Sequence, residues 1–139
     1  MRGDYSCTLD AKGRIIFPAK LREELGESFV IFRGFDNCIT VYKNQDWQTF
    51  EEKLSALGSE GLELQRYYSV NFLCEPDSQG RMMIPDSLRN HASLQTGKDQ
   101  VIIIGMQNKA EIWDKTRWDA YNAGVEKMDL RSMQKALGL

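Results

Sequence analysis

The sequence predicts an α+β fold in which two tandem β-loop-β-α-β-β repeats share one core, with connecting and C-terminal helices. The pattern Asp-x-x-Gly-Arg occurs twice, as Asp10-Ala-Lys-Gly-Arg14 and as Asp77-Ser-Gln-Gly-Arg81, 67 residues apart. Apolar residues make up 42% of the 139 residues, which is enough for one shared core. Because two copies are too few for a solenoid, we expect them to pack on each other.

The similarity between the copies extends past this motif. Arg14-Ile-Ile-Phe-Pro18 matches Arg81-Met-Met-Ile-Pro85, and Leu21-Arg22 matches Leu88-Arg89, at the same offset. An insertion of four residues then changes the offset to 71, at which Val30-Ile31 matches Val101-Ile102, Gly34 matches Gly105, Asn37 matches Asn108, Tyr42 matches Trp113, and Trp47 matches Trp118. We predict a first repeat over 5–47, a helical connector over 48–71, a second repeat over 72–118 and a C-terminal helix over 119–139.

The first repeat should begin with a half-buried strand, because Tyr5, Cys7 and Leu9 alternate with polar residues. Pro18 suits the first turn of a helix, and Gly26 is a suitable end for it. The expected elements are strands over 5–9 and 14–17, a helix over 19–25, and strands over 29–33 and 38–42.

The connector should contain two helices. Asp46 is a candidate N-cap for the first, whose apolar residues at helical spacing are Trp47, Phe50, Leu54 and Leu57. The second should span 62–68, and the second repeat should follow with strands over 69–75, 81–84, 100–105 and 110–113, a helix over 85–92, and a loop over 94–99. The last helix should begin near Asp114, with an apolar face at Trp118, Tyr121, Val125 and Met128 that Leu130, Met133 and Leu137 extend toward a neighbouring subunit.

The repeated loop combines a hydrogen-bond acceptor, a flexible glycine and a fork of donors. Asp can accept backbone N–H groups, and Gly takes a positive φ without a steric clash. The simplest interpretation of one copy is a hairpin turn in which Arg pairs with its own Asp. However, Arg14 and Arg81 follow the Gly directly, where a guanidinium suits a phosphate or a guanine edge. Lys12 adds a cation to the first loop, whereas Gln79 takes its place in the second.

Charge is distributed unevenly along the chain. The net charge is −2, yet residues 1–22 carry +3 and the remainder carries −5. A basic patch on an acidic body can bind DNA, although one copy provides few phosphate contacts.

Other classes of protein lack support in the sequence. No G-x-S-x-G, P-loop, H-E-x-x-H or Rossmann motif is present, and His91 is the single histidine, so we expect no enzyme activity, cofactor or small-molecule substrate. Three cysteines without a C-x-x-C pair argue against zinc and disulfides, and the equivalent Cys7 and Cys74 should face the core. The first residues lack an apolar signal segment and the run 101–104 is too short to cross a bilayer, so we expect a cytoplasmic protein without membrane contact.

The sequence resembles the MraZ family of bacterial transcriptional regulators of the division and cell-wall gene cluster. The resemblance is carried by Leu9-Asp-Ala-Lys-Gly-Arg-Ile-Ile-Phe-Pro18 and by Asp77-Ser-Gln-Gly-Arg-Met-Met-Ile-Pro85, which contain the Asp-x-x-x-Arg motif of that family. Gly105, Ile112-Trp113 and Trp118 also fit, so the resemblance covers essentially the whole chain.

This resemblance implies both a fold and a function. The family belongs to the AbrB-like swapped-hairpin DNA-binding proteins, so residues 5–45 and 72–115 should form an intramolecular pseudo-dimeric swapped-hairpin β-barrel. Family members form rings that bind repeated promoter elements, which implies a nucleoid-associated homo-oligomer that binds double-stranded DNA upstream of its own gene cluster. The implied DNA-binding residues are Arg14, Lys12, Arg81, Lys20, Arg22, Arg89 and Arg2, and the loop-shaping residues are Asp10, Gly13, Asp77 and Gly80.

Several alternatives remain open at this stage. Arg14 can reach a base edge or a phosphate, and Lys20, Arg22 and Arg89 can instead form ion pairs on helix faces. The same fold family includes antitoxins, which would favour a disordered acidic tail. A structural ring or scaffold protein, in which the loops are only turns, is the other alternative.

Overall fold

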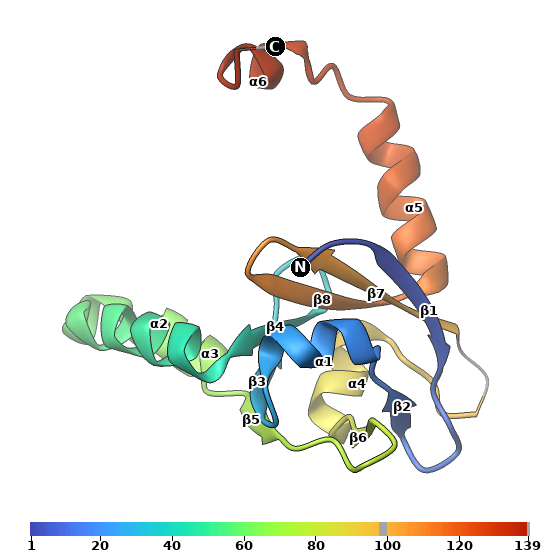
Figure 1. Ribbon diagram of the computed structural model, residues 1–139. Helices are drawn as coiled ribbons and strands as arrows, with labels where there is room; N and C mark the ends of the chain where they lie inside the picture. Colours follow the sequence, from blue (N-terminus) through green and yellow to red (C-terminus); the bar gives the residue numbers. More distant parts are fainter. Residues whose placement is uncertain (98–99, 139) are drawn as a thin grey trace.

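The computed structural model describes residues 1–97 and 100–138, and Figure 1 shows its ribbon. The loop expected over 94–99 is therefore described as far as Gly97, and positions 98, 99 and 139 lie outside the described residues. The elements before the connector are β1 (Asp4–Thr8), β2 (Arg14–Ile16), α1 (Ala19–Leu25), β3 (Phe29–Arg33) and β4 (Ile39–Lys43). The connector contains α2 (Asn44–Ala56), a 3₁₀ turn (Gly58–Gly61) and α3 (Leu62–Tyr68). The remaining elements are β5 (Asn71–Cys74), β6 (Arg81–Met83), α4 (Asp86–Ala92), β7 (Gln100–Met106), β8 (Lys109–Asp114), α5 (Lys115–Glu126) and α6 (Arg131–Lys135).

Strands from the two copies are interleaved. The larger sheet has the order β1-β7-β8-β4-β3-β5, so β1 pairs with β7 of the second copy and β5 pairs with β3 of the first. The smaller sheet pairs β2 with β6, again one strand from each copy. Every pairing is antiparallel. The six-stranded sheet has β1 and β5 at its edges, so its hydrogen bonds do not close it into the barrel that the resemblance implied.

One core lies between the two sheets and the short helices. Residues at equivalent places in both copies contribute to it, such as Phe17 with Ile84 and Leu21 with Leu88, all at most 1% exposed. Since neither copy can complete this core alone, the two copies form a single folding unit. The repeat boundaries drawn from the sequence remain a prediction.

The register of the strands corrects the sequence alignment of β3 with β7. Ile31 pairs with Val41, and Ile103 pairs with Ile112, and all four side chains face the core. Ile31 therefore corresponds to Ile103 at an offset of 72, rather than to Ile102 at 71. The two hairpins differ by one residue in their turns, and a one-residue slip turns every side chain of a strand to the opposite face.

Two smaller clusters attach the longer helices to the outer face of the large sheet. Trp47 of α2 and Tyr68 of α3 pack on Val30 and Phe32, and Trp118 of α5 packs on Trp113. Figure 1 shows the α2–α3 hairpin extending to one side of the sheet, whereas α5 rises on the other side and α6 stands apart from the body.

The helix ends agree only in part with those predicted from the sequence. Helix α2 begins at Asn44, so Asp46 lies in its first turn and is not the N-cap that we expected. Asp114 does cap α5, because its carboxylate accepts the Arg117 N–H at 3.0 Å. The apolar face expected for the last helix is partly uncovered, since Tyr121 is 44% exposed and Met128, which lies beyond the end of α5, is 54% exposed.

The equivalent cysteines differ in burial. Cys74 is buried, as expected, whereas Cys7 is only half-buried. Burial raises the pKa of the Cys7 thiol to about 11 and that of Cys74 to about 12, so both thiols stay protonated at neutral pH. Within the described residues, no helix has the length and apolar character needed to span a membrane.

Candidate nucleic-acid interface

The first Asp-x-x-Gly-Arg loop is a closed hydrogen-bonded turn. Asp10 Oδ1 accepts the backbone N–H groups of Lys12 at 2.9 Å and Arg14 at 2.8 Å, and its Oδ2 accepts Arg14 Nε at 2.9 Å. The backbone closes beneath it, because Asp10 N donates to Arg14 O at 2.9 Å and Gly13 N donates to Asp10 O at 3.1 Å. Gly13 has a φ of +79°, which only glycine adopts without strain.

The second loop repeats this geometry. Asp77 Oδ1 accepts the N–H groups of Gln79 and Arg81, each at 2.9 Å, and its Oδ2 accepts Arg81 Nε at 2.8 Å. Gly80 has a φ of +82°. The four residues that the sequence assigned to loop shape therefore occupy the same positions in both copies.

Both loop carboxylates are held in their ionised form. Hydrogen bonds from the backbone N–H groups of Arg14 and Arg81 are the largest influence that lowers the pKa of Asp10 and Asp77, respectively, and the Arg side chains add to it. At neutral pH each carboxylate therefore binds the Nε edge of its arginine. This contact fixes the direction in which the guanidinium points.

We expect these carboxylates to make the loops acid-sensitive. A carboxyl whose folded pKa lies below the ordinary value of 3.8 stabilises the folded state fully above that value and loses this effect as pH falls through the folded pKa. Asp10→Asn keeps the shape but not the charge, so its melting temperature should fall less between about pH 5 and pH 2 than that of the wild type. Asp129→Asn, an exposed site outside the loops, is the control, and an equal fall in the Asp10 and control variants would contradict this prediction.

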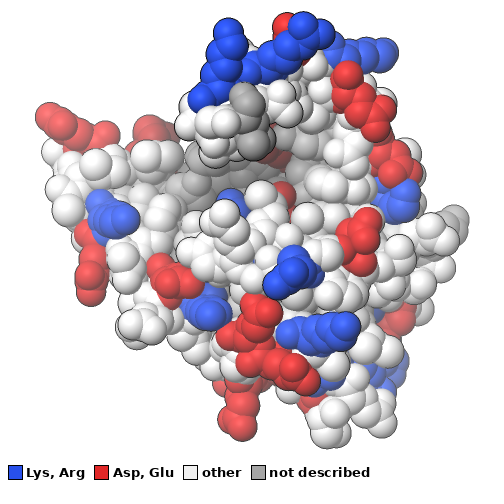
Figure 2. Space-filling view, turned by 45° about the horizontal axis from the view of Figure 1, so that its top comes forward, with Lys and Arg blue, Asp and Glu red and all other residues white. Residues whose placement is uncertain are grey.

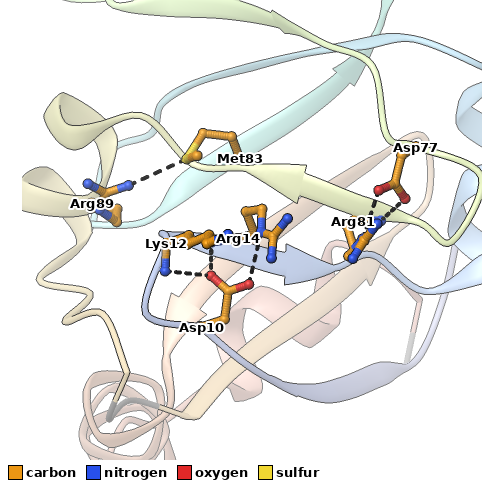
Figure 3. Close-up of polar contacts among 7 residues, drawn as sticks. All are labelled: Asp10, Lys12, Arg14, Asp77, Arg81, Met83 and Arg89. Atoms are coloured by element: carbon orange, nitrogen blue, oxygen red, sulfur yellow. Dashed lines mark hydrogen bonds and ion pairs between the residues drawn. The ribbon is translucent and has the colours of Figure 1, made fainter.

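The β2–β6 ribbon brings the two arginines to one outward face. Its register pairs Arg14 with Met83 and Ile16 with Arg81, so these four side chains share a face. The residues between them, Ile15 and Met82, are 1% and 2% exposed and face the core. Figure 3 shows the two Asp–Arg pairs along this ribbon.

The outward guanidinium edges are available for a ligand. The side chain of Arg14 is 31% exposed and that of Arg81 is 40% exposed. Each uses Nε for its own Asp, and neither donates from its terminal Nη groups to an acceptor within residues 1–97 and 100–138. A guanidinium in this position can donate two parallel hydrogen bonds to one planar acceptor.

Arg22 and Arg89 lie over the loops of the opposite copy. A Cβ on Gly80 would come within 2.9 Å of Arg22 Cζ, and a Cβ on Gly13 would collide with Arg89. Arg22 Nε donates to Phe17 O at 3.1 Å, and Arg89 donates to Ile84 O and to Asp86. These arginines therefore lie beside the loops, but part of each guanidinium already donates hydrogen bonds to acceptors of the protein.

The other predicted cations are less closely grouped. Lys12 is exposed at the tip of the first loop, and Lys20 is exposed on α1. Arg2 precedes β1, whereas the first loop follows the other end of that strand, so the structure does not bring Arg2 to the loops. We therefore leave Arg2 out of the interface.

The surroundings of the two loops differ in charge. The charged side chains that line an open cleft between α1 and the second loop are the carboxylates of Glu23, Glu27, Glu75 and Asp77 and the guanidinium of Arg22. At the first loop, the positions equivalent to Glu23 and Glu75 are Asn90 and Thr8, which are neutral. Figure 2 shows positive and negative side chains interspersed over the body, whereas positive side chains gather along the upper edge of the view.

The fold and this surface define a class of protein. It is a duplicated α+β protein that presents paired arginines on a ribbon shared by both copies. Among the described residues no group of three or more His, Cys, Asp or Glu side chains is placed to hold a metal ion. The single histidine, His91, donates from Nε2 to Gly34 O at 2.7 Å, and burial is the main cause that lowers its pKa.

Known proteins place the chain in a family. Residues 1–65 and 68–137 match a family model described as "MraZ protein, putative antitoxin-like". A protein of Lachnoclostridium phytofermentans is 47% identical over 85% of this chain and 84% of its own. Proteins of Caldanaerobacter subterraneus and Ligilactobacillus salivarius are 43% and 44% identical, over 91% and 90% of this chain and 89% and 88% of theirs. All three are named transcriptional regulator MraZ.

The chain belongs to the MraZ family, as its resemblance in sequence implied. This is a family of transcriptional regulators and not of enzymes, which confirms the expectation that the chain has no enzyme activity.

Proposed function

We propose that the protein is a sequence-specific DNA-binding regulator of transcription that reads the major groove with its β2–β6 ribbon. The observation that carries this proposal is the placement of Arg14 and Arg81 on one outward ribbon face, each oriented by its own aspartate. The major groove admits a two-stranded ribbon, and arginine bonded to both O6 and N7 of guanine is the commonest specific contact there. The names of the relatives agree with this role.

The first loop is the stronger of the two binding elements in this proposal. Lys12 adds a cation that can bind a phosphate beside the base contacted by Arg14. The second loop has Gln79 instead and borders the acidic cleft, which repels the DNA backbone. Lys20, Arg22 and Arg89 supply further positive charge around the ribbon.

We propose a ring-shaped homo-oligomer that binds repeated elements upstream of its own division and cell-wall genes, at the nucleoid. One protomer offers few phosphate contacts, so several protomers on one DNA gain affinity through effective concentration. Their sites should lie about 10 bp apart on one face of the duplex. The exposed apolar residues of the C-terminal arm provide a candidate contact between protomers: Met128, Leu130, Met133 and Leu137.

The interleaved strands support the swapped-hairpin assignment. In this interpretation each copy supplies strands that complete the sheet of the other, as two chains do in relatives with a single copy. The sheet stays open in this chain, so the assignment concerns strand exchange and not a closed barrel.

Two other functions have less support. An antitoxin is the alternative that the family description also mentions, and the ordered α5 gives no sign of a disordered acidic tail within the described residues. A purely structural ring protein would need the loops only as turns, and it would leave the outward Arg14 and Arg81 without a role.

The direct test is a footprint on DNA upstream of the protein's own gene at two salt concentrations. We expect protected segments about 10 bp apart that weaken steeply at the higher salt. A protein that oligomerises but protects no segment at either salt concentration would refute the proposal and favour a scaffold.

Replacing Lys12 should alter the salt dependence without altering the sequence preference. Lys12→Gln gives the first loop the residue that the second loop already has. Each protomer then loses one phosphate contact, so the slope of log K against log salt should fall by about 0.9 per bound protomer. Titrations at three or more salt concentrations measure this slope, with Lys53→Gln on α2 as the control. An unchanged slope would remove Lys12 from the interface.

A further inference from the structure

Two large apolar side chains stand on the ribbon face between the arginines. Ile16 is 59% exposed and Met83 is 50% exposed, although the neighbouring Ile15 and Met82 are buried. Ile16 and Met83 occupy equivalent positions, 67 residues apart, so both copies of the loop are followed by an outward apolar residue. A strand face that only met water would gain nothing from such residues.

The register places each apolar side chain directly across from an arginine. Met83 is the partner of Arg14, and Ile16 is the partner of Arg81, so charged and apolar groups alternate around the face. Side chains that face each other across two strands lie roughly 5 Å apart. Met83 also lies beside Arg89, whose Nη1 is 3.9 Å from the sulfur, as Figure 3 shows.

This alternation matches the chemistry of the major groove. Guanine presents two acceptors there, and the C5-methyl group of thymine is the apolar feature of that surface. A phosphate is not a suitable partner for Ile16 or Met83, because an aliphatic side chain cannot bond to it. The positive charge of Arg14 and Arg81 favours DNA over an apolar protein partner for this face.

We propose that Ile16 and Met83 contact thymine methyl groups next to the guanines bound by Arg81 and Arg14. This inference rests on the proposed function. It extends that function by naming thymine as the base that Ile16 and Met83 select. Base pairs are stacked 3.4 Å apart. A separation of roughly 5 Å between facing side chains therefore places the selected thymine one or two base pairs from the guanine.

The test uses the footprinted DNA with single thymines replaced by uracil, which lacks only the methyl group. For the wild type, uracil at the contacted position should weaken binding about fourfold, as expected for one buried methyl group. Ile16→Ala and Met83→Ala should each weaken binding to thymine-containing DNA and lose the response to uracil at one position. This pairing of two perturbations isolates the contact itself.

Controls separate this contact from changes in fold or assembly. Leu73→Ala removes a side chain with 61% exposure on β5, in the other sheet, and should leave both the affinity and the response to uracil unchanged. The melting temperature of Ile16→Ala should match that of the wild type, because the side chain lies outside the core.

The outcomes distinguish the two levels of the proposal. Wild-type protein that leaves a footprint but responds to uracil nowhere, or Ile16→Ala and Met83→Ala variants that respond as the wild type does, would overturn the methyl contact and leave the DNA-binding role intact. A smaller oligomer for either variant, with an unchanged response to uracil, would show that the face joins copies of the chain. Absence of any wild-type footprint would overturn both.

Discussion

Arg14→Ala should remove most of the affinity for the specific site. One bidentate arginine–guanine contact is worth about 1–3 kcal/mol, so each bound protomer should lose about 5-fold to 150-fold in affinity. Several protomers on one DNA multiply this loss, so the footprint should disappear at concentrations that give full protection with the wild type. Arg81→Ala should have the smaller effect, because its loop lacks Lys12 and borders the acidic cleft.

A charge-matched control distinguishes the loss of the Arg14 contact from a general loss of positive charge. Arg66→Ala removes the same charge from α3, where the side chain is 68% exposed, and should leave the footprint intact. Arg14→Lys keeps the charge but loses the planar fork, so discrimination between sequences should fall while the salt dependence stays. Unchanged binding by Arg14→Ala, with a normal melting temperature, would show that the first loop does not bind DNA.

Phe17→Ala should cause the largest loss of stability. Phe17 is fully buried, its ring centroid lies 5.2 Å from that of Phe29, and its N–H donates to Gly80 O at 2.8 Å. Truncation of a buried phenylalanine costs about 3–5 kcal/mol in the free energy of unfolding. Urea unfolding followed by circular dichroism and by tryptophan fluorescence should show a lower midpoint with both probes.

The adjacent residue is the natural control for this substitution. Ile16→Ala should change the free energy of unfolding by no more than about 0.5 kcal/mol, since Ile16 faces outward. Both variants should unfold in one transition, because residues of the two copies share the core. Two separate transitions in Phe17→Ala would contradict a shared core.

Local sequence patterns predicted most of the secondary structure. The helix expected over 19–25 and the strand expected over 29–33 have the bounds that the structure gives to α1 and β3. Proline, glycine and alternating apolar residues influence the backbone conformation of only a few neighbouring positions. Their effect on secondary structure can therefore be predicted without knowledge of the tertiary fold. The motif also indicated the loop geometry, since the acceptor, the glycine and the arginine are close in sequence.

Features that depend on partners distant in sequence were harder to predict. The offset between β3 and β7 was wrong by one residue, because consecutive aliphatic residues do not show which face of a strand each one occupies. The same ambiguity in Ile15-Ile16 concealed the outward position of Ile16. The placement of Arg22 and Arg89 over the opposite loops follows only from strand exchange, which no local signal reports. Asp46 was a plausible cap by residue type, but the first residue of α2 is Asn44, two positions before Asp46.

Strand exchange also determines when the protein can fold during its synthesis. Asp4 pairs with Ile104, one hundred residues further along, so β1 has no partner until β7 has left the ribosome. At typical rates of translation, this delay is about 5–20 s. Throughout that interval the nascent N-terminal half keeps an unpaired strand and an uncovered apolar surface, and both features favour aggregation.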